Sequence, residues 1–308
     1  MKHLFIVNPT AGGQDKTMEV SLAVKKALRD SADEYEVYVT TAPMDAAEKI
    51  REEAKNCDHL RVYACGGDGT FNECVCGAAL LENVAVCPYP TGTGNDFCRM
   101  FGEEKDLFRD LGALLRGTEQ PIDLIDCNGR YSANICSVGI DARVGTSVHE
   151  YGSIPFLGKG SAYVVSAAVN VFKGIASPMT IRCGDFFHSG KTTLACACNG
   201  RFYGGGFNPS RKARPDDGIM DIYIVKKVNL LEFALLIGKY AAGESDKLTR
   251  YVTHLRTAEA LEMEFDGTEV VNVDGEAMRA DKLTMRMVPK ALQLIVPKGM
   301  TFFEDETL

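Results

Sequence analysis

The sequence predicts two domains, an α/β domain with a mostly parallel sheet over residues 1–125 and an antiparallel β-sandwich over residues 126–290. Strand-like and helix-like segments alternate through the first of these ranges, as in a parallel sheet covered by helices. Beyond it, Asn-Gly and Asp-Gly pairs separate short strand-like runs, which is typical of antiparallel hairpins. A length of 308 residues also favours two domains of ordinary size.

The first domain is predicted from short apolar runs that alternate with segments of helical periodicity. Residues 4–7 are apolar throughout, whereas Val20, Ala23 and Val24 recur at the spacing of one helix face. The expected strands cover 4–7, 35–41, 59–65 and 84–88, and the expected helices cover 15–30, 45–56, 70–82 and 106–116.

The second domain is predicted from two hairpin signals. Asn128-Gly129 lies between strand-like runs, and both residues tolerate the positive φ angles that a two-residue hairpin turn requires. Asp266-Gly267 lies in the same way between Leu261–Phe265 and Glu269–Val273. The other expected strands are Met179–Cys183, Thr193–Cys198, Met220–Val225, Leu283–Val288 and Leu292–Val296, and the expected helices are Ser161–Phe172 and Leu230–Tyr240.

Composition excludes several classes of function. A net charge of −8 argues against a nucleic-acid-binding protein. Eleven cysteines without a secretory leader are typical of a reducing compartment, so we expect a cytoplasmic protein. The C-x-C pairs at 74/76 and 196/198 lie in apolar runs, which favours buried side chains over metal ligands. The longest apolar stretch, Leu230 to Ala242, is too short for a transmembrane segment, so lipid contact would be peripheral.

The most informative segment is 65–73, Cys-Gly-Gly-Asp-Gly-Thr-Phe-Asn-Glu, which joins a strand-like run to a helix-like one. Its glycines allow the backbone to approach a ligand that a Cβ atom would exclude. Thr70 is placed to cap the helix, whose free N–H groups attract anions. The carboxylate of Asp68 fits here if Mg²⁺ mediates between it and a phosphate. A tight turn with a solvated Asp68 is the alternative.

Two other strand ends share this composition. Residues 4–7 lead into Asn8-Pro9-Thr10-Ala11-Gly12-Gly13, and residues 84–88 lead toward Gly92-Thr93-Gly94-Asn95-Asp96. In an open α/β sheet such loops gather at the carboxyl ends of the strands, where ligands bind. The three loops therefore predict one phosphate site. The P-loop pattern is absent and the dinucleotide fingerprint is incomplete, so neither of those classes is supported.

These motifs resemble, in order, those of the diacylglycerol kinase catalytic domain, and the fit is closest to its soluble, single-chain lipid kinases. The resemblance extends from Asn8 to Glu276, because Pro215–Asp221 and Asp274-Gly275-Glu276 also agree with it. Gly-Gly-Asp-Gly is shared with NAD kinases, whereas the Asn-Pro and Gly-Thr-Gly-Asn-Asp motifs are more specific to the lipid kinases.

The resemblance implies an ATP-dependent kinase that phosphorylates diacylglycerol, or a related lipid alcohol, to give phosphatidic acid in phospholipid biosynthesis. It also implies that residues 126–290 bind the lipid, that residues 291–308 return to the first domain, and that a homodimer is an open option. The residues implied to contact ATP are Asn8, Pro9, Thr10, Ala11, Gly12, Thr41 (or Thr40), Gly67, Asp68, Gly69, Thr70, Phe71, Asn72, Glu73 and Thr93.

Three acidic residues are the catalytic candidates. Asp68 and Asp96 are candidates for binding catalytic Mg²⁺, which takes few carboxylates and keeps its waters. Asp96 also fits the N-cap of a following helix. By resemblance, Glu276 is the candidate general base, because Asp274-Gly275-Glu276 matches the lipid-kinase motifs in order and distance and follows a strand that can hold the acid rigidly. An ordinary Asp-Gly-Glu turn is the alternative. The related NAD kinases assign this role to the Gly-Gly-Asp aspartate, so Asp68 is the alternative base.

By resemblance, a second and structural Mg²⁺ is held by Asp217 and the backbone carbonyls of Arg214 and Ile219. A solvated turn is the alternative. Basic residues before this turn could instead face anionic lipid headgroups, namely Arg211, Lys212 and Arg214.

Two other functions stay open. The same chemistry would serve an NAD kinase or a sphingoid-base kinase, and stimulation by liposomes separates NAD kinase from a lipid kinase. A lipid-binding regulator without turnover is the non-enzymatic alternative, although Asp68, Asp96 and Glu276 are all present.

Overall fold

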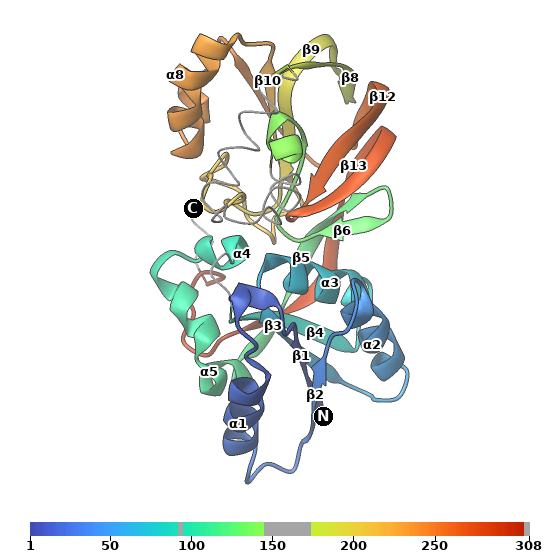
Figure 1. The fold of residues 1–308 in the computed structure, drawn as a ribbon, viewed down its shortest axis with the longest axis vertical. Helices are drawn as coiled ribbons and strands as arrows, with labels where there is room; N and C mark the ends of the chain where they lie inside the picture. The colour runs from blue at the N-terminus through green and yellow to red at the C-terminus, as the bar shows by residue number, and fades with distance from the viewer. Residues whose placement is uncertain (92–94, 145–173, 305–308) are drawn as a thin grey trace. The chain divides into compact units, whose positions relative to one another are not determined.

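The computed structural model describes residues 1–91, 95–144 and 174–304 (Figure 1). The chain forms two compact units. Unit 1 consists of Met1–Leu124 and Pro289–Leu308, and unit 2 consists of Ile125–Val288. The expected helix Ser161–Phe172 and the predicted ATP contact Thr93 lie outside the described residues.

Unit 1 contains a sheet with the strand order β2-β1-β3-β4, extended by the C-terminal end of β13. All of these pairs are parallel. Buried apolar side chains of the central strands hold this sheet in the core, and the rings of Phe5 and Tyr63 stack with centroids 4.4 Å apart. The strands are β1 Lys2–Val7, β2 Glu34–Val39, β3 Leu60–Gly66 and β4 Val84–Pro90.

Helices of unit 1 pack in pairs, α2 with α3 and α1 with α5 (Figure 1). The predicted helix 106–116 is wrong as one element, because Asp110 takes an extended conformation and begins a new helix. Its carboxylate accepts a hydrogen bond from the Ala113 amide at 3.1 Å, which satisfies one of the free N–H groups of that helix. The helices are η1 Ala11–Gly13, α1 Thr17–Ala27, α2 Asp45–Ala54, α3 Asp68–Ala78, α4 Asp96–Arg99, η2 Gly102–Arg109 and α5 Leu111–Leu115.

Unit 2 is built from antiparallel strands in the order β11-β10-β9-β7-β12-β13, and β8 pairs with both β9 and β12. The prediction of a mostly parallel sheet therefore does not describe the whole sheet, because parallel strand pairing is confined to unit 1. The strands are β5 Thr118–Cys127, β6 Arg130–Ser132, β7 Ile135–Gly139, β8 Ser177–Cys183, β9 Phe186–Cys198, β10 Met220–Lys226, β11 Val252–Thr257, β12 Leu261–Val273 and β13 Glu276–Val296.

The hairpin expected at Asn128-Gly129 is confirmed, with positive φ at both residues and antiparallel pairing of β5 with β6. The hairpin expected at Asp266-Gly267 is wrong, because both flanking runs belong to the single strand β12. Only Gly267 has a positive φ there, and the pairing with β13 shifts between Glu264 and Glu269, so the extra residues form a bulge.

The turn that reverses the chain is Asp274-Gly275 instead. Both of its residues have positive φ, 52° and 97°, as a two-residue type I′ turn requires. The strand that follows, β13, is continuous from Glu276 to Val296 and includes both of the shorter strands expected at 283–288 and 292–296.

Two apolar clusters form the core of unit 2. The larger one contains inward side chains of β7–β10, β12 and β13, such as Ile181, Ile222 and Val271. The smaller one contains Tyr240 of helix α8 together with Tyr203 and Leu248. The helices of this unit are α8 Leu230–Ala241 and η3 Ser245–Lys247. None of the helices in the described part of the chain combines the length and apolar character needed to cross a bilayer.

Candidate functional site

The three glycine-rich loops of unit 1 are joined to one another at the carboxyl ends of the neighbouring strands β1, β3 and β4. The side-chain amide of Asn8 donates to the Thr70 hydroxyl at 3.2 Å. The Thr91 amide donates to the Gly66 carbonyl at 3.2 Å. The first bond joins residues that are about sixty positions apart in sequence, and together the two bonds bring the three loops into one site, as the strand-end argument predicts.

The start of α3 is the centre of this site. Gly67 is its N-cap, and a Cβ atom there would meet nothing within 4 Å. At Gly66, by contrast, a Cβ atom would come within 2.2 Å of the Thr70 hydroxyl, so only glycine fits this close turn. The expectation that Thr70 caps this helix is wrong, because Thr70 is its third residue and Gly67 is the N-cap. A helix start with no capping side chain offers backbone N–H groups and the positive end of the helix dipole to an anion.

The loop after β1 is held by its own polar residues. The Asn8 side-chain oxygen accepts from the amide of Thr10 at 3.0 Å and from its hydroxyl at 2.8 Å. Gly12 then turns the chain with a φ of 69° inside η1. The loop is therefore ordered by Asn8 on one side and tied to α3 by the same residue, which gives this predicted ATP contact a clear positioning role.

The other predicted residues on α3 divide into two kinds. Phe71 is 4% exposed and packs against Phe97 with ring centroids 4.7 Å apart, and Asn72 is fully buried. Neither side chain is available to a ligand, so any nucleotide contact of theirs would use the backbone. Asp68, Gly69 and Glu73 are only partly buried.

Both candidate magnesium-binding residues lie at helix starts. Asp68 begins α3, and its Oδ1 atom accepts from the Phe97 amide at 3.4 Å, which links it to α4. Asp96 is the first residue of α4, whose N-cap is Asn95, so the N-cap role expected for Asp96 is wrong. Asp96 is 6% exposed and forms an ion pair with Arg99 Nε at 2.9 Å. The two carboxylates are thereby connected to the same short helix.

Thr40 and Thr41 lie at the end of β2, next to β1 in the sheet. The hydroxyl of Thr41 donates to Asp45 Oδ2 at 2.9 Å, and that of Thr40 donates to the Val7 carbonyl at 3.4 Å. Thr41 is exposed whereas Thr40 is half-buried, so Thr41 is the more accessible of the two.

In unit 2, Glu276 is placed by the Asp274-Gly275 turn. The Asp274 carboxylate accepts from the Ser132 hydroxyl and from the backbone amides of Ala133, Asn134 and Ile135. This set of donors anchors the turn to the segment between β6 and β7. Glu276 is the first residue of β13 and is half-buried, so a rigid element carries the candidate base.

The loop before β10 contains two ion pairs. The Arg214 guanidinium contacts both oxygens of Asp216, at 2.9 and 3.0 Å. One oxygen of Asp217 accepts from the Ile219 amide at 3.0 Å, and the other accepts from the Arg256 guanidinium. Burial raises the pKa of Asp217 above its ordinary value, while Arg256 and the Ile219 amide act in the opposite direction. A cationic side chain thus contacts the carboxylate that the resemblance assigns to Mg²⁺.

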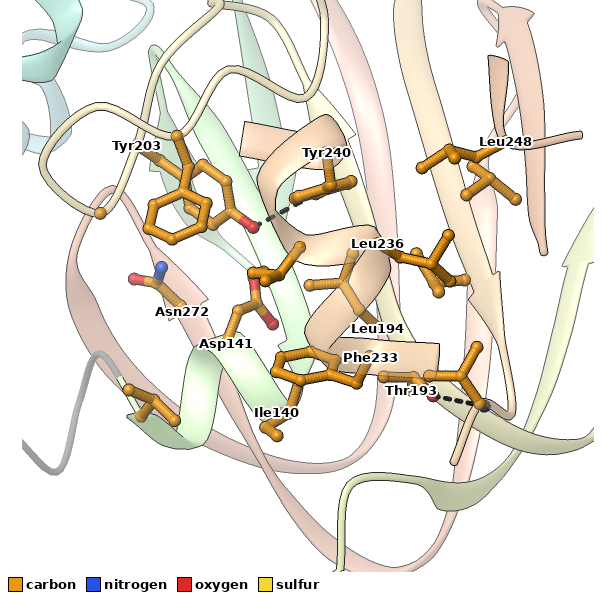
Figure 2. A pocket seen from close by; sticks show the side chains of 17 residues that line it. Ile140, Asp141, Thr193, Leu194, Tyr203, Phe233, Leu236, Tyr240, Leu248 and Asn272 are labelled. Atoms are coloured by element: carbon orange, nitrogen blue, oxygen red, sulfur yellow. Dashed lines mark hydrogen bonds between the residues drawn. The ribbon is translucent and has the colours of Figure 1, made fainter. Parts of the chain in front are cut away.

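Unit 2 also contains a pocket that the sequence analysis did not predict (Figure 2). Its volume is about 280 Å³, and its walls are almost entirely apolar. Helix α8 supplies one wall, with Phe233, Leu236, Ile237 and Tyr240 facing inward. A narrow apolar space of this kind suits hydrocarbon better than a nucleotide.

A short chain of polar groups runs through this pocket. The hydroxyls of Tyr203 and Tyr240 lie 3.2 Å apart, and the carboxyl group of Asp141 lies in the same pocket (Figure 2). Burial raises the pKa of Asp141 to about 6. Its carboxyl group is therefore an acid that changes charge near neutral pH.

Asn272 connects the pocket to the candidate base. It lines the pocket, donates to the Ser137 hydroxyl at 3.5 Å, and accepts from the Gly275 amide at 2.8 Å. The Asp274-Gly275 turn before Glu276 is thus held from both sides, by Asn272 and by the donors around Asp274. Asp141 and Asn272 were missed in the sequence, and Asp274 was named only as part of the motif that precedes Glu276. Val138-Gly139-Ile140-Asp141 nevertheless repeats the pattern of an apolar strand that ends in a glycine and an acid.

Together, these features define a class of protein: an α/β unit with an anion-attracting loop site, combined with a β-rich unit that contains an apolar pocket. Residues 2–127 match the diacylglycerol kinase catalytic domain, and residues 134–296 match the YegS C-terminal NAD kinase beta sandwich-like domain. The chain belongs to the YegS-like lipid kinase family.

Similar proteins agree along the whole chain. A probable lipid kinase YegS-like of Pseudomonas aeruginosa is 31% identical over 297 residues, covering 96% of this chain and 95% of the relative. A protein of the same name from Shewanella frigidimarina is 29% identical and covers 88% of this chain and 87% of the relative. The crystal structure of a diacylglycerol kinase from Bacillus anthracis has a TM-score of 0.70 at 22% identity, covering 97% of this chain and 98% of that one, which shows the shared fold.

The family confirms the resemblance and the two-domain architecture with its β-sandwich-like second domain. It also supports a kinase-type phosphotransferase acting on lipid, and a kinase of this family uses ATP.

Proposed function

We propose that the protein transfers the γ-phosphoryl group of ATP to the hydroxyl of diacylglycerol, or of a closely related lipid alcohol, to give phosphatidic acid. The observation that carries this proposal is the apolar pocket of unit 2 and its connection to Glu276 through Asn272. An acyl chain in the pocket would hold its glycerol end near a rigidly placed carboxylate. Both features belong to one unit and would act on the same substrate.

Unit 1 would hold the nucleotide. The unblocked start of α3 and the ordered Asn8 loop offer backbone donors to phosphate oxygens, which is the fit that ATP requires. Asp68 and Asp96 would hold the Mg²⁺ of the nucleotide, which supplies charge neutralisation for the transferred phosphoryl group. Within the described residues no cluster of three metal-ligating side chains occurs, but Mg²⁺ bound with ATP needs only one or two carboxylates.

Glu276 would accept the proton of the lipid hydroxyl as the phosphoryl group is transferred. Its attachment to the Asp274-Gly275 turn fixes its position, and a fixed geometry is the main requirement for a general base. Asp68 remains the alternative base, because related kinases use the aspartate of the Gly-Gly-Asp motif.

The structural Mg²⁺ at Asp217 stays a proposal, and it requires that the ion displace Arg256 from this carboxylate. An ion held by Asp217 and the carbonyls of Arg214 and Ile219 would have to replace Arg256, since a guanidinium and a dication repel each other at one carboxylate. The homodimer likewise stays a proposal, as do the cytoplasmic location and the peripheral contact with the membrane.

A sphingoid-base kinase is the second candidate, and one observation favours it. Asp141 places a carboxyl group in an otherwise apolar pocket, where it could pair with the ammonium group of a sphingoid base. An uncharged diacylglycerol offers no such partner. NAD kinase is less favoured, because NAD has no use for an apolar pocket.

Transfer of labelled phosphate from ATP to diacylglycerol, sphingosine or NAD in mixed micelles tests the proposal. We expect diacylglycerol to be the best acceptor. The variant Leu236→Trp, which fills the pocket, should raise KM for long-chain diacylglycerol roughly tenfold. The control Leu22→Trp changes a 60%-exposed leucine on α1 and should change nothing. Preference for sphingosine that is lost in Asp141→Asn would establish the second candidate instead.

A further inference from the structure

Helix α8 is apolar on both of its faces. Its inner face lines the pocket with Phe233, Leu236 and Ile237. Its outer face carries Leu230, Leu231 and Leu235, which are 54%, 77% and 77% exposed. Ala234 and Gly238 complete this outer face and are also exposed. The charged residues of α8 are Glu232 near its start and the exposed Lys239 near its end. A helix as apolar as this on both sides is normally buried in a core or in lipid, so its exposed leucines indicate a partner.

The local sequence makes α8 a stable helix without help from that partner. Asn229 and Glu232 form a capping box, with bonds of 2.9 and 2.8 Å between each side chain and the other residue's amide. At the other end, the Arg211 guanidinium donates to the Ala242 carbonyl, where a cation opposes the negative end of the helix dipole. The exposed leucines are therefore displayed on a well-formed helix.

Lys191 in β9 lies beside Lys226 and Lys227, which shortly precede α8 in the sequence. Lys227 donates its amide to the Lys191 carbonyl at 3.0 Å, and Lys226 pairs with Thr192 in the β9–β10 ladder. All three lysine side chains are exposed, and none forms an ion pair with an acid anywhere in the described ranges. This positive cluster stands out in a chain whose net charge is −8.

We propose that the outer face of α8, together with Lys191, Lys226 and Lys227, docks on the surface of an anionic lipid bilayer. The exposed leucines would enter the boundary between headgroups and acyl chains, as in helices that lie in the membrane plane. The lysines would contact anionic headgroups. The inner face of the same helix lines the pocket, so docking would place the pocket wall at the lipid surface.

A second copy of the chain is a weaker choice of partner. In a symmetric dimer the same patch faces itself, so both lysine clusters would be buried in one interface, and none of these lysines has an acidic partner among the described residues. A bilayer satisfies the apolar and the basic halves of the surface at once. The proposal rests on the protein acting on lipid but not on which lipid alcohol it phosphorylates.

Sedimentation with vesicles tests this surface without ATP and without diacylglycerol. Wild type should bind vesicles of phosphatidylcholine with phosphatidylglycerol better than vesicles of phosphatidylcholine alone, and added salt should weaken the binding. The double variant Leu231→Gln with Leu235→Gln should bind at least tenfold more weakly. Replacing Lys191, Lys226 and Lys227 by Gln should cost roughly fivefold for each lysine.

Matched controls lie on α1 of unit 1, where Leu22→Gln changes an exposed leucine and Lys25→Gln with Lys26→Gln changes exposed lysines. These controls should bind vesicles like wild type. All variants should phosphorylate a dispersed short-chain diacylglycerol at the wild-type rate. If wild type itself does not phosphorylate the short-chain diacylglycerol, the result counts against the proposed function but not against the vesicle-binding proposal.

Two outcomes would overturn the docking proposal. One is vesicle binding that is unchanged in the α8 and lysine variants. The other is a dimer, measured by light scattering in solution, that the Leu231 and Leu235 changes dissociate, since the face would then be an interface between copies of the chain.

Discussion

The candidate phosphate site of unit 1 and the pocket of unit 2 are constructed in different ways. The first uses consecutive residues and backbone groups, such as the Gly66-Gly67 turn and the start of α3. The second uses side chains from distant segments, since Ile140 and Asn272 line the same pocket. A backbone site depends on local motifs and tolerates few changes in them, whereas a side-chain pocket depends on how strands and helices pack.

This difference predicts where single substitutions act. In unit 1, a changed carboxylate should affect the transfer step and leave lipid affinity alone. In unit 2, a changed pocket residue should affect lipid affinity or stability, and only Glu276 and the turn that positions it should affect the transfer step. The following predictions test that division.

The largest effect is expected at Glu276. If it accepts the proton of the lipid hydroxyl, Glu276→Gln should lower kcat by about 10²–10⁴-fold, because a general base acts in the transition state. The KM for ATP should change little, since the nucleotide is assigned to unit 1. Steady-state kinetics with varied ATP and saturating lipid measure both values.

Asp274→Asn is a useful comparison for that variant. It keeps the shape of the turn but removes the charge that four donors from the segment 132–135 contact. We expect lower stability as well as lower activity, whereas Glu276→Gln should melt like wild type. An unchanged kcat in Glu276→Gln would move the role of base to Asp68.

A somewhat smaller effect is expected at Asp68. Removal of one positioned electrostatic contact of this kind commonly costs about 10²–10³ in rate, so Asp68→Asn should lose that much turnover. The amide can still accept from the Phe97 backbone, so the link to α4 and the fold should persist. Circular dichroism and melting check the fold, and near-normal turnover in a folded variant would contradict the phosphate-site assignment.

The sequence allowed much of unit 1 to be predicted, because its elements have local causes. A few consecutive residues determine each of these elements, namely the Asn8 loop, the Gly66-Gly67 turn and the apolar strands before them. The one long helix expected at 106–116 failed because Asp110 also caps a helix, and a capping residue inside a periodic segment breaks it.

Unit 2 was harder for a reason that its two Asp-Gly pairs illustrate. Asp266-Gly267 and Asp274-Gly275 look alike in sequence, yet the first is a bulge and the second is the hairpin turn. Asp274-Gly275 is distinguished by the hydrogen-bond donors that contact Asp274, and these lie between β6 and β7, more than a hundred residues earlier in the sequence. The pocket was missed for the same reason, because its lining residues share no local pattern.

A moderate effect on stability is expected at Asp141. Its pKa is about 6 in the folded protein against an ordinary value of 3.8, so the folded state binds more protons between these values and loses stability as the pH rises through them. Asp141→Asn cannot ionise and should remove this loss. Its gain over wild type should be absent near pH 4 and reach at most about 3 kcal/mol above pH 7.

Urea unfolding of both proteins at several pH values measures that difference. Asparagine has nearly the same shape as aspartate but no charge, so the comparison mainly reports the charge. A constant destabilisation of Asp141→Asn at every pH would mean that the polar contacts of this side chain matter more than its ionisation. Tyr203→Phe serves as a control, because it removes a hydroxyl from the same pocket without changing a group that titrates between pH 4 and 7.

The smallest effect is expected at the loop that contains Asp217. If Mg²⁺ binds there, it stabilises the fold by about 1.4 kcal/mol when the free ion is at about ten times its Kd, which corresponds to a few degrees in melting temperature. Because Arg256 contacts the same carboxylate, it should compete with the ion. The shift should therefore be larger in Arg256→Gln than in wild type and absent in Asp217→Asn, in melts without nucleotide. If Mg²⁺ shifts none of the three proteins, the Asp217–Arg256 ion pair holds this loop alone and the structural metal has to be abandoned, whereas the Asp68 and Glu276 assignments would stand.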